Sequence, residues 1–216
     1  MSIRNLVKSI QDIMRKDTGV DGDAQRMSQL VWMFFLKIMD DQDEALEITQ
    51  DDYTSPIPED LQWRTWAADP EGITGDTLLA FLNDELFPRL KKLSPQKGPR
   101  AKVVRDVFED AYNYMKSGQL LRQVINKINE VDFNNLTERQ HFGDIYEQLL
   151  NDLQNAGNAG EYYTPRAVTA FMVQQIDPKP GEILMDPACG TGGFLTCAMR
   201  HMRDKHIKRP EDETLM

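Results

Sequence analysis

The chain has very few cysteines: Cys189 and Cys197 are the only two among 216 residues. Two cysteines make neither a disulfide framework nor a zinc site. Cys189 lies in a glycine-rich turn, and Cys197 lies in the apolar-periodic stretch that follows it. We therefore expect both to be reduced thiols of a cytosolic protein.

Long hydrophobic runs are also missing. The longest one, Leu30 to Met39, contains Lys37 and is too short to span a bilayer. Residues 1–16 are interrupted by charged and polar side chains every few positions, so they lack the apolar core of a signal peptide. These absences predict a soluble, cytoplasmic protein with no membrane partner.

Positive charge is scarce: the chain has 25 lysines and arginines and 35 aspartates and glutamates, which gives a formal net charge of -10. An acidic chain can belong to a nucleic-acid enzyme, but this one has no overall basic footprint. If DNA is the substrate, basic surface must come from elsewhere or from a local patch. Residues 200–209 form such a patch, although a solvated helix face explains them more simply.

The chain does have strong helical periodicity over its first 155 residues or so, within a length that allows one or two domains. One apolar stripe is formed by Ile3, Leu6, Val7, Ile10, Ile13 and Met14. A stronger one is formed by Met27, Leu30, Val31, Phe34, Phe35 and Ile38, widened by Trp32 and Met33. We expect this second helix to be central to the core.

Loops and further helices follow. Residues 49–75 contain several prolines and glycines, so we expect a long loop whose Trp63 and Trp66 tuck onto the helical core. Helices are predicted from about Asp76 to Pro88, from Ala101 to Lys116 and from Gln119 to Asn129, with a proline- and glycine-containing link over residues 94–100.

The predicted helical domain closes with one more helix. Thr137 and Gln140 have the spacing of a capping box, and apolar residues then recur at helical spacing up to Leu153. The glycine- and asparagine-rich segment 155–160 ends that helix. We place the domain boundary there, giving a helical domain over 1–155 and a second domain over 156–216.

The second domain has the order helix, turn, strand, glycine loop, helix. Thr164 and Pro165 are typical of a helix start, with a capping hydroxyl before a proline that needs no N–H partner. The buried face of that helix is predicted to be Val168, Phe171, Met172 and Ile176. Residues 177–181 turn the chain into a strand at 182–186. The predicted fold is thus helical, followed by the first elements of a Rossmann-like α/β domain.

The glycine loop is the most informative feature. Three glycines within four positions after Asp186 let a ligand approach the backbone closely. Phe194 after Gly193 excludes a P-loop, and Leu195 breaks the dinucleotide fingerprint counted from Gly190. The acidic Asp186 suits a ligand with a cationic amino group. S-adenosylmethionine fits, although spacing alone is only suggestive.

Two paired motifs resemble a known family. Glu161-Tyr-Tyr-Thr-Pro-Arg166, followed by Asp186-Pro-Ala-Cys-Gly-Thr-Gly-Gly-Phe194, is similar to the modification subunit of type I restriction-modification systems. Residues 26–41 also resemble part of the helical N-terminal domain of that family. The resemblance covers nearly the whole chain.

The resemblance implies an S-adenosylmethionine-dependent enzyme that methylates the exocyclic amino group of adenine in DNA, on a base flipped out of the duplex. It implies the following cofactor-binding residues: Glu161, Tyr162, Tyr163, Thr164, Pro165, Arg166, Asp186, Gly190, Thr191, Gly192 and Gly193. Thr164 and Pro165 have a helix cap as an equally good explanation, and Phe194 can simply pack beneath the loop. The implied partners are DNA, a specificity subunit that reads the target, a restriction subunit and a second modification subunit.

The catalytic motif of the family, Asn-Pro-Pro followed by Phe or Tyr, occurs nowhere in these 216 residues. We therefore interpret the chain as an N-terminal fragment without catalytic residues, inactive by itself. An alternative is an interaction module that docks the specificity subunit and DNA, and a third is a methyltransferase acting on protein or RNA. His141, His201 and His206 show no metal-ligand spacing, so no metal is expected.

Overall fold

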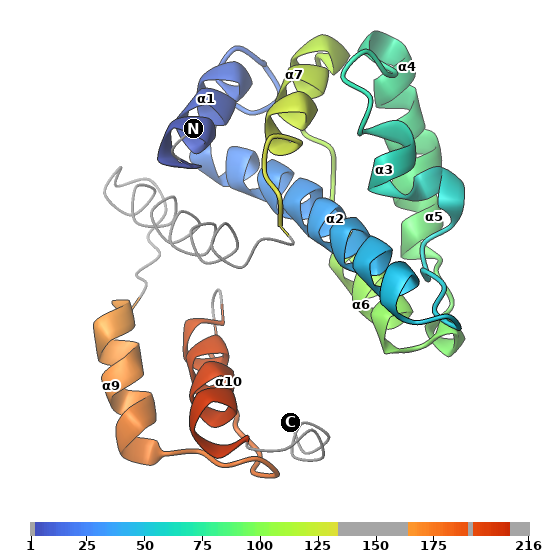
Figure 1. The fold of residues 1–216 in the computed structure, drawn as a ribbon. Helices are drawn as coiled ribbons and strands as arrows, with labels where there is room; N and C mark the ends of the chain where they lie inside the picture. Colours follow the sequence, from blue (N-terminus) through green and yellow to red (C-terminus); the bar gives the residue numbers. More distant parts are fainter. Residues whose placement is uncertain (1–2, 134–163, 190–191, 208–216) are drawn as a thin grey trace. The chain divides into compact units, whose positions relative to one another are not determined.

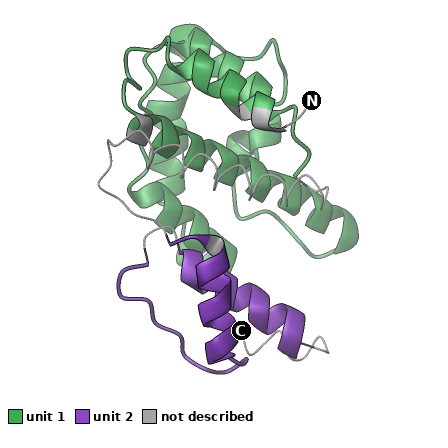
Figure 2. Ribbon diagram, turned by 90° about the vertical axis from the view of Figure 1, so that its left-hand side faces the viewer, with its two compact units in different colours: residues 1–149 green, residues 150–216 purple. Residues whose placement is uncertain are grey.

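The computed structural model describes residues 3–133, 164–189 and 192–207. The chain divides into two compact units, residues 1–149 and residues 150–216 (Figure 2). The described part of both units is helical and contains no β-strand. No helix among these residues is long and apolar enough to cross a membrane.

Unit 1 is built around α2 (Asp23–Thr49), which lies against α3 (Trp63–Trp66) and α7 (Gly118–Ile128), while α1 (Ile3–Met14) packs on α7. Helix α7 lies between α1 and α4 (Gly75–Ala80), and it also contacts α2 (Figure 1). The predicted stripe of α1 is confirmed at Leu6, Ile10 and Met14, which are buried. Helix α2 is central to the core, as predicted.

The buried face of α2 differs in detail from the predicted stripe. Trp32, Met33 and Leu36 are its most buried members, whereas Val31 is 41% exposed. Trp32 contacts the rings of Phe87 and Phe108, so the aromatic side chains of three helical segments meet at this point of the core. The predicted packing role of the aromatic residues is confirmed, but the face is rotated toward Trp32.

The long loop after α2 folds back on the core through its tryptophans, as predicted. It contains the short 3-10 helix η1 (Glu59–Leu61) and α3. The indole N–H of Trp63 donates to Asn129 Oδ1 over 2.7 Å, and that of Trp66 donates to the Leu61 carbonyl over 3.2 Å. Both rings are buried, and each polar N–H has a partner.

The helix predicted to end at Pro88 continues through it. Helix α4, the π-helical segment η2 (Phe81–Leu86) and α5 (Phe87–Lys91) follow one another without a break. A proline inside a regular helix clashes with the carbonyl four residues earlier. Here that carbonyl belongs to Asp84, which lies in the wider π-helical segment. The Phe87 N–H bonds to the Leu82 carbonyl, five residues back, so the hydrogen-bond register has already shifted before Pro88.

The next helix is shorter than predicted. After the 3-10 turn η3 (Pro95–Lys97), α6 spans Pro99–Glu109 and does not reach Lys116. In the segment after α6, side chains distant in sequence accept backbone N–H groups that a longer helix would bond internally. Asp17 accepts those of Lys116 and Ser117, and Gln29 accepts that of Tyr114. Ser117 then caps α7, whose predicted position is confirmed.

Unit 2 contains α9 (Arg166–Ile176) and α10 (Gly193–His206), which pack against each other (Figure 1). The predicted buried face of α9 is wrong: Val168, Phe171, Met172 and Ile176 are 43–64% exposed. Thr169 and Val173 are buried instead. Periodicity identifies an apolar stripe, but only the narrower face toward α10 is covered within the described part of this unit.

The predicted strand at 182–186 is not present among the described residues, so the Rossmann-like start is not confirmed. The segment is extended without strand hydrogen bonding, and Ile183 and Met185 are 98% and 81% exposed. A strand needs the backbone groups of a neighbour to form a ladder, and an isolated extended segment has none. The capping box at Thr137, its helix and the linker 155–160 lie outside the described residues.

Candidate cofactor site

The first predicted motif is described only in part. Thr164 and Pro165 are exposed and precede α9, whereas Glu161, Tyr162 and Tyr163 lie outside the described residues. Helix α9 begins at Arg166 with Pro165 in the N-cap position, and no side chain caps it, contrary to the expected role of the Thr164 hydroxyl. The Pro165 carbonyl instead accepts the N–H groups of Val168 and Thr169, over 2.9 and 3.1 Å.

The second motif makes two successive turns between the extended segment and α10. Asp186 Oδ1 accepts the Ala188 N–H over 3.1 Å, and the Cys189 carbonyl accepts the Gly192 N–H over 2.8 Å. Gly192 has φ 74° and ψ 24°, a left-handed conformation that favours glycine, and it is the N-cap of α10. Gly190 and Thr191, which lie between these points, are outside the described residues.

The end of this loop is open to a ligand. A Cβ atom built on Gly192 or Gly193 would meet nothing within 4 Å, so the protein itself does not fill the space beside them. Cys189 is exposed, and Phe194 is half-buried. Space next to a backbone without side chains is what a closely held small molecule requires.

The electrostatics of the loop suit a zwitterion. The amino end of α10, a helix of 14 residues, begins at Gly193 and attracts anionic groups. The half-buried carboxylate of Asp186 lies at the other end of the loop and can accept a cationic amino group. The two ends of one loop thus offer opposite charges. No described hydrogen bond joins this loop to Thr164 or Pro165, so the union of the two motifs stays a prediction.

A second group of polar residues in unit 2 was missed by sequence reasoning. Asp177 Oδ1 lies 2.7 Å from His201 Nε2, 2.9 Å from His206 Nε2 and 2.8 Å from Lys205 Nζ. Hydrogen bonding from Lys205, then from His201 and His206, lowers the pKa of Asp177 well below its usual range. Asp177 ends α9, and the other three residues lie in the last turns of α10.

This group could not be found from sequence spacing. Asp177 is 24 residues from His201 in the chain, and the two histidines are five residues apart, a spacing that does not align side chains on a regular helix. At the end of α10 the Ile207 N–H bonds to the Met202 carbonyl, five residues back. That wider turn brings His206 round to the side of His201.

Comparisons with known proteins agree on one family across the whole chain. The profile of the HsdM N-terminal domain matches residues 3–128, and that of the N-6 DNA Methylase family matches residues 137–214. The chain is 65% identical over 214 residues to the type I restriction enzyme EcoEI methylase subunit of Escherichia coli. That match covers 98% of this chain and 44% of the relative.

Solved structures give the same picture. The chain is similar to a modification subunit of a putative type I restriction enzyme from Vibrio vulnificus YJ016, with a TM-score of 0.88 and 39% identity, over all of this chain and 48% of that one. A chain from a study of complex assembly and conformational transition of the type I R-M system follows, with a TM-score of 0.80 and 34% identity over 43% of its length. The chain therefore spans less than half the length of these relatives.

Proposed function

The chain belongs to the methylase (modification) subunits of type I restriction-modification systems, and on that basis we propose that it provides the S-adenosylmethionine-binding segment of a DNA adenine methyltransferase. The observation that carries the proposal is the open loop from Asp186 to Gly193, which lies within the region matching the N-6 DNA Methylase family. A relative with 65% identity is named as a methylase subunit, which supports the same class of reaction.

Each described group of the loop has a place in the proposal. The Asp186 carboxylate takes the ammonium group of the methionine moiety, and the amino end of α10 takes its carboxylate. Gly192 and Gly193 let the cofactor lie against the backbone. The residues 161–166, with Tyr162 and Tyr163, complete the pocket in the family pattern.

The reaction proposed for the longer protein is methyl transfer to the exocyclic nitrogen of adenine. The nitrogen attacks the methyl carbon, the carbon–sulfur bond breaks, and the amine then loses a proton. The Asn-Pro-Pro-aromatic motif that would orient the amine is not in this sequence, so the chain contributes cofactor binding to the reaction and no catalytic side chain.

The experiment that tests the loop compares glycines of matched geometry. Gly192 and Gly181 both have a left-handed φ, 74° and 87°, and an empty Cβ position, but only Gly192 belongs to the motif. Calorimetric titration of S-adenosylmethionine should show that Gly192→Val weakens binding at least about tenfold, whereas Gly181→Val binds like the wild type. Gly193→Ala adds a single methyl group in open space and should also weaken binding.

Equal binding by all four proteins would place the cofactor elsewhere. The same substitutions in the longer protein, assayed by transfer of a labelled methyl group to adenine-containing DNA, should give the same ranking of activities.

A second function is supported by unit 1. It is a compact helical unit with its own core, and it matches a separate family profile, the HsdM N-terminal domain. We propose that it docks the specificity subunit and DNA within a complex that also holds a restriction subunit and a second modification subunit. Complex formation between this chain and a purified specificity subunit, without cofactor, supports docking. If complex formation required cofactor, docking would depend on the methyltransferase site instead.

A further inference from the structure

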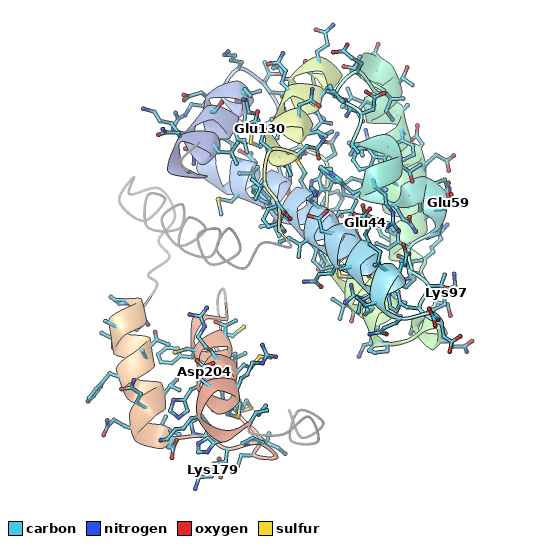
Figure 3. All side chains as sticks on the ribbon, in the orientation of Figure 1. Glu44, Glu59, Lys97, Glu130, Lys179 and Asp204 are labelled. Atoms are coloured by element: carbon cyan, nitrogen blue, oxygen red, sulfur yellow. The ribbon has the colours of Figure 1, made fainter. Side chains whose placement is uncertain are left out.

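The polar cluster of Asp177, His201, Lys205 and His206 lies at the C-terminal ends of α9 and α10. It has no part in the proposed methyl transfer. We propose that Asp177, His201 and His206 bind a divalent transition-metal ion, with Zn²⁺ as the ion that fits best. Asp177 follows the last residue of α9, and both histidines belong to α10. Figure 3 labels Lys179, two residues after Asp177, and Asp204, between the two histidines in sequence.

The ligand atoms already converge. One atom of each residue, Nε2 of both histidines and a carboxylate oxygen of Asp177, lies within 4.8 Å of the others. The two Nε2 atoms are 2.7 and 2.9 Å from Asp177 Oδ1. Ligands of a tetrahedral zinc ion are about 3.3 Å apart, given bond lengths of about 2.0–2.1 Å. Each Nε2 atom therefore needs to move only a few tenths of an ångström from Asp177 Oδ1 to reach that separation.

The backbone at the site has two unusual features that bring the ligands together. Asp177 has φ 50°, and it is the only non-glycine residue with a positive φ in the described part of the chain. It occupies the position after a helix where glycine is usual, so the carboxylate replaces a residue that would fit with less strain. The wide last turn of α10 places His206 beside His201.

The chemistry of the ligands selects the ion. Two imidazole nitrogens and one carboxylate suit Zn²⁺ and its neighbours in the transition series, whereas Mg²⁺ and Ca²⁺ prefer oxygen ligands alone. The side chains of His201, His206 and Asp177 are 13%, 21% and 33% exposed, so a solvated ion can reach them. Three protein ligands leave a coordination position for water.

Lys205 is the competitor for this ion. Its ammonium group donates to Asp177 Oδ1 over 2.8 Å and would have to leave when a cation binds. The Lys205 side chain is 53% exposed, so it can turn into water at little cost. In the absence of metal, Lys205 supplies the positive charge that the carboxylate needs. This competition distinguishes a metal site from a plain hydrogen-bonded helix cap.

A bound ion would fasten the end of α9 to the end of α10. Asp177 and α10 flank the segment that contains the extended residues 182–186 and the glycine loop. The ion would thus close a short loop of chain and stabilise unit 2 through the free energy of binding. This role does not depend on the proposed cofactor site, and either proposal can fail without the other.

The test is calorimetric titration of Zn²⁺ into the metal-free 216-residue chain, with one ion expected per chain. His201→Gln and His206→Gln should each weaken binding at least about tenfold because each removes an imidazole ligand, and Asp177→Asn should do so because it removes the negative charge of the third ligand. Asparagine tolerates the left-handed backbone, so Asp177→Asn keeps the turn and removes only the charge. The matched control is His141→Gln, which changes the third histidine of the chain and should bind like the wild type.

A second variant tests the proposal where a ligand variant fails to fold. Lys205→Gln should bind Zn²⁺ more tightly, by about fivefold, because a positive charge next to the ion is removed. A hydrogen-bonded cap without metal-binding capacity would show no such gain. The visible spectrum of bound Co²⁺ provides a further readout, since its bands should disappear in His206→Gln and persist when Cys189 and Cys197 are both changed to Ser.

Absence of stoichiometric binding by the wild type would overturn the proposal. So would binding by His201→Gln or His206→Gln that equals the wild type, because the ion would then lie elsewhere.

Discussion

Arg122 is a buried cation whose partners are main-chain carbonyls rather than a carboxylate. Its guanidinium donates to the carbonyls of Trp66, Ala67, Asp69 and Ile73, over 2.6–3.2 Å. Burial lowers its pKa, and the charge of Asp69 opposes that effect. The planar fork of five N–H donors fits several carbonyls at once. A residue of α7 thereby holds the tryptophan-containing loop onto the core of unit 1.

We predict that Arg122→Lys lowers the free energy of unfolding of unit 1 by about 2–4 kcal/mol, because a lysine cannot reach all four carbonyls and leaves some buried without a donor. Urea unfolding followed by tryptophan fluorescence measures this change, since two of the three tryptophans, Trp63 and Trp66, lie in the loop that Arg122 holds. Arg105→Lys is the control, because Arg105 pairs only with its neighbour Asp106 on the surface, and it should unfold like the wild type. Equal urea midpoints for Arg122→Lys and Arg105→Lys would show that the hydrogen bonds of Arg122 to the four carbonyls contribute nothing to stability.

At the scale of single elements, α9 offers the sharpest contrast. Phe171 and Val173 lie two residues apart on the same helix, yet Phe171 is 61% exposed and Val173 only 5%. Sequence periodicity favours Phe171 as a core residue, whereas the packing against α10 selects Val173. The two positions therefore allow a direct test of which face holds the helix pair together.

We predict that Val173→Asp unfolds the pair of helices, since an unpaired charge would be buried against α10. Phe171→Asp should leave the pair folded, within about 0.5 kcal/mol, because the ring is already in water. Hydrogen exchange of the α9 and α10 amides, measured by mass spectrometry, distinguishes the two outcomes. Protection that is lost in Phe171→Asp and kept in Val173→Asp would reverse the assignment of the buried face.

Secondary structure was predicted correctly where it depends on neighbouring residues in the sequence. It was predicted wrongly where it depends on contacts with other segments. The helices α1, α2 and α7 follow from apolar spacing, and the tucked tryptophans follow from their place in a polar loop. The continuation through Pro88 depends on a shift of the backbone hydrogen-bond register just before it. The segment after α6 is held by hydrogen bonds to side chains distant in sequence, such as that of Asp17. The strand at 182–186 was predicted from its composition, but a strand also needs a neighbour.

The candidate sites show the same division. The glycine loop was predicted because its spacing in the sequence is itself the signal, and the structure places Gly192 at the start of α10 in the conformation that glycine favours. The group of Asp177, His201 and His206 was missed because a left-handed residue and a widened helical turn create it. Neither feature has a signature in residue order, although an acidic residue directly before a proline at a helix end could have been noted.

At the scale of the whole molecule, the two units contain different carboxyl groups with shifted pKa values. All three tryptophans, Trp32, Trp63 and Trp66, lie in unit 1, so tryptophan fluorescence reports on that unit alone. Asp40 also lies in unit 1, where it accepts the Arg64 N–H over 2.8 Å and is 3% exposed. Asp177 lies in unit 2. Acid and base should therefore act on the two units through different carboxyl groups.

Burial raises the pKa of Asp40 to about 6, even though the Arg64 N–H and the Arg64 charge oppose the shift. Since the folded state then holds the proton more tightly than the unfolded state, the contribution of Asp40 to stability is fully present below about pH 4. It is lost as the pH rises through about 6. The difference amounts to about 3 kcal/mol at most. Asp177 behaves in the opposite way: its lowered pKa gives a contribution that is present above about pH 4 and lost only in stronger acid.

We predict that Asp40→Asn reduces the pH dependence of unit 1, to which Asp41 also contributes because burial raises its pKa, and leaves that of unit 2 unchanged. Between about pH 4 and about pH 7, wild-type unit 1 should lose up to about 3 kcal/mol relative to the variant, measured by urea unfolding with tryptophan fluorescence. Hydrogen exchange of α10 amides follows unit 2 in the same samples. If α10 protection changed in step with the fluorescence, the two units would unfold together, and the pH response of either could no longer be assigned to one carboxyl group.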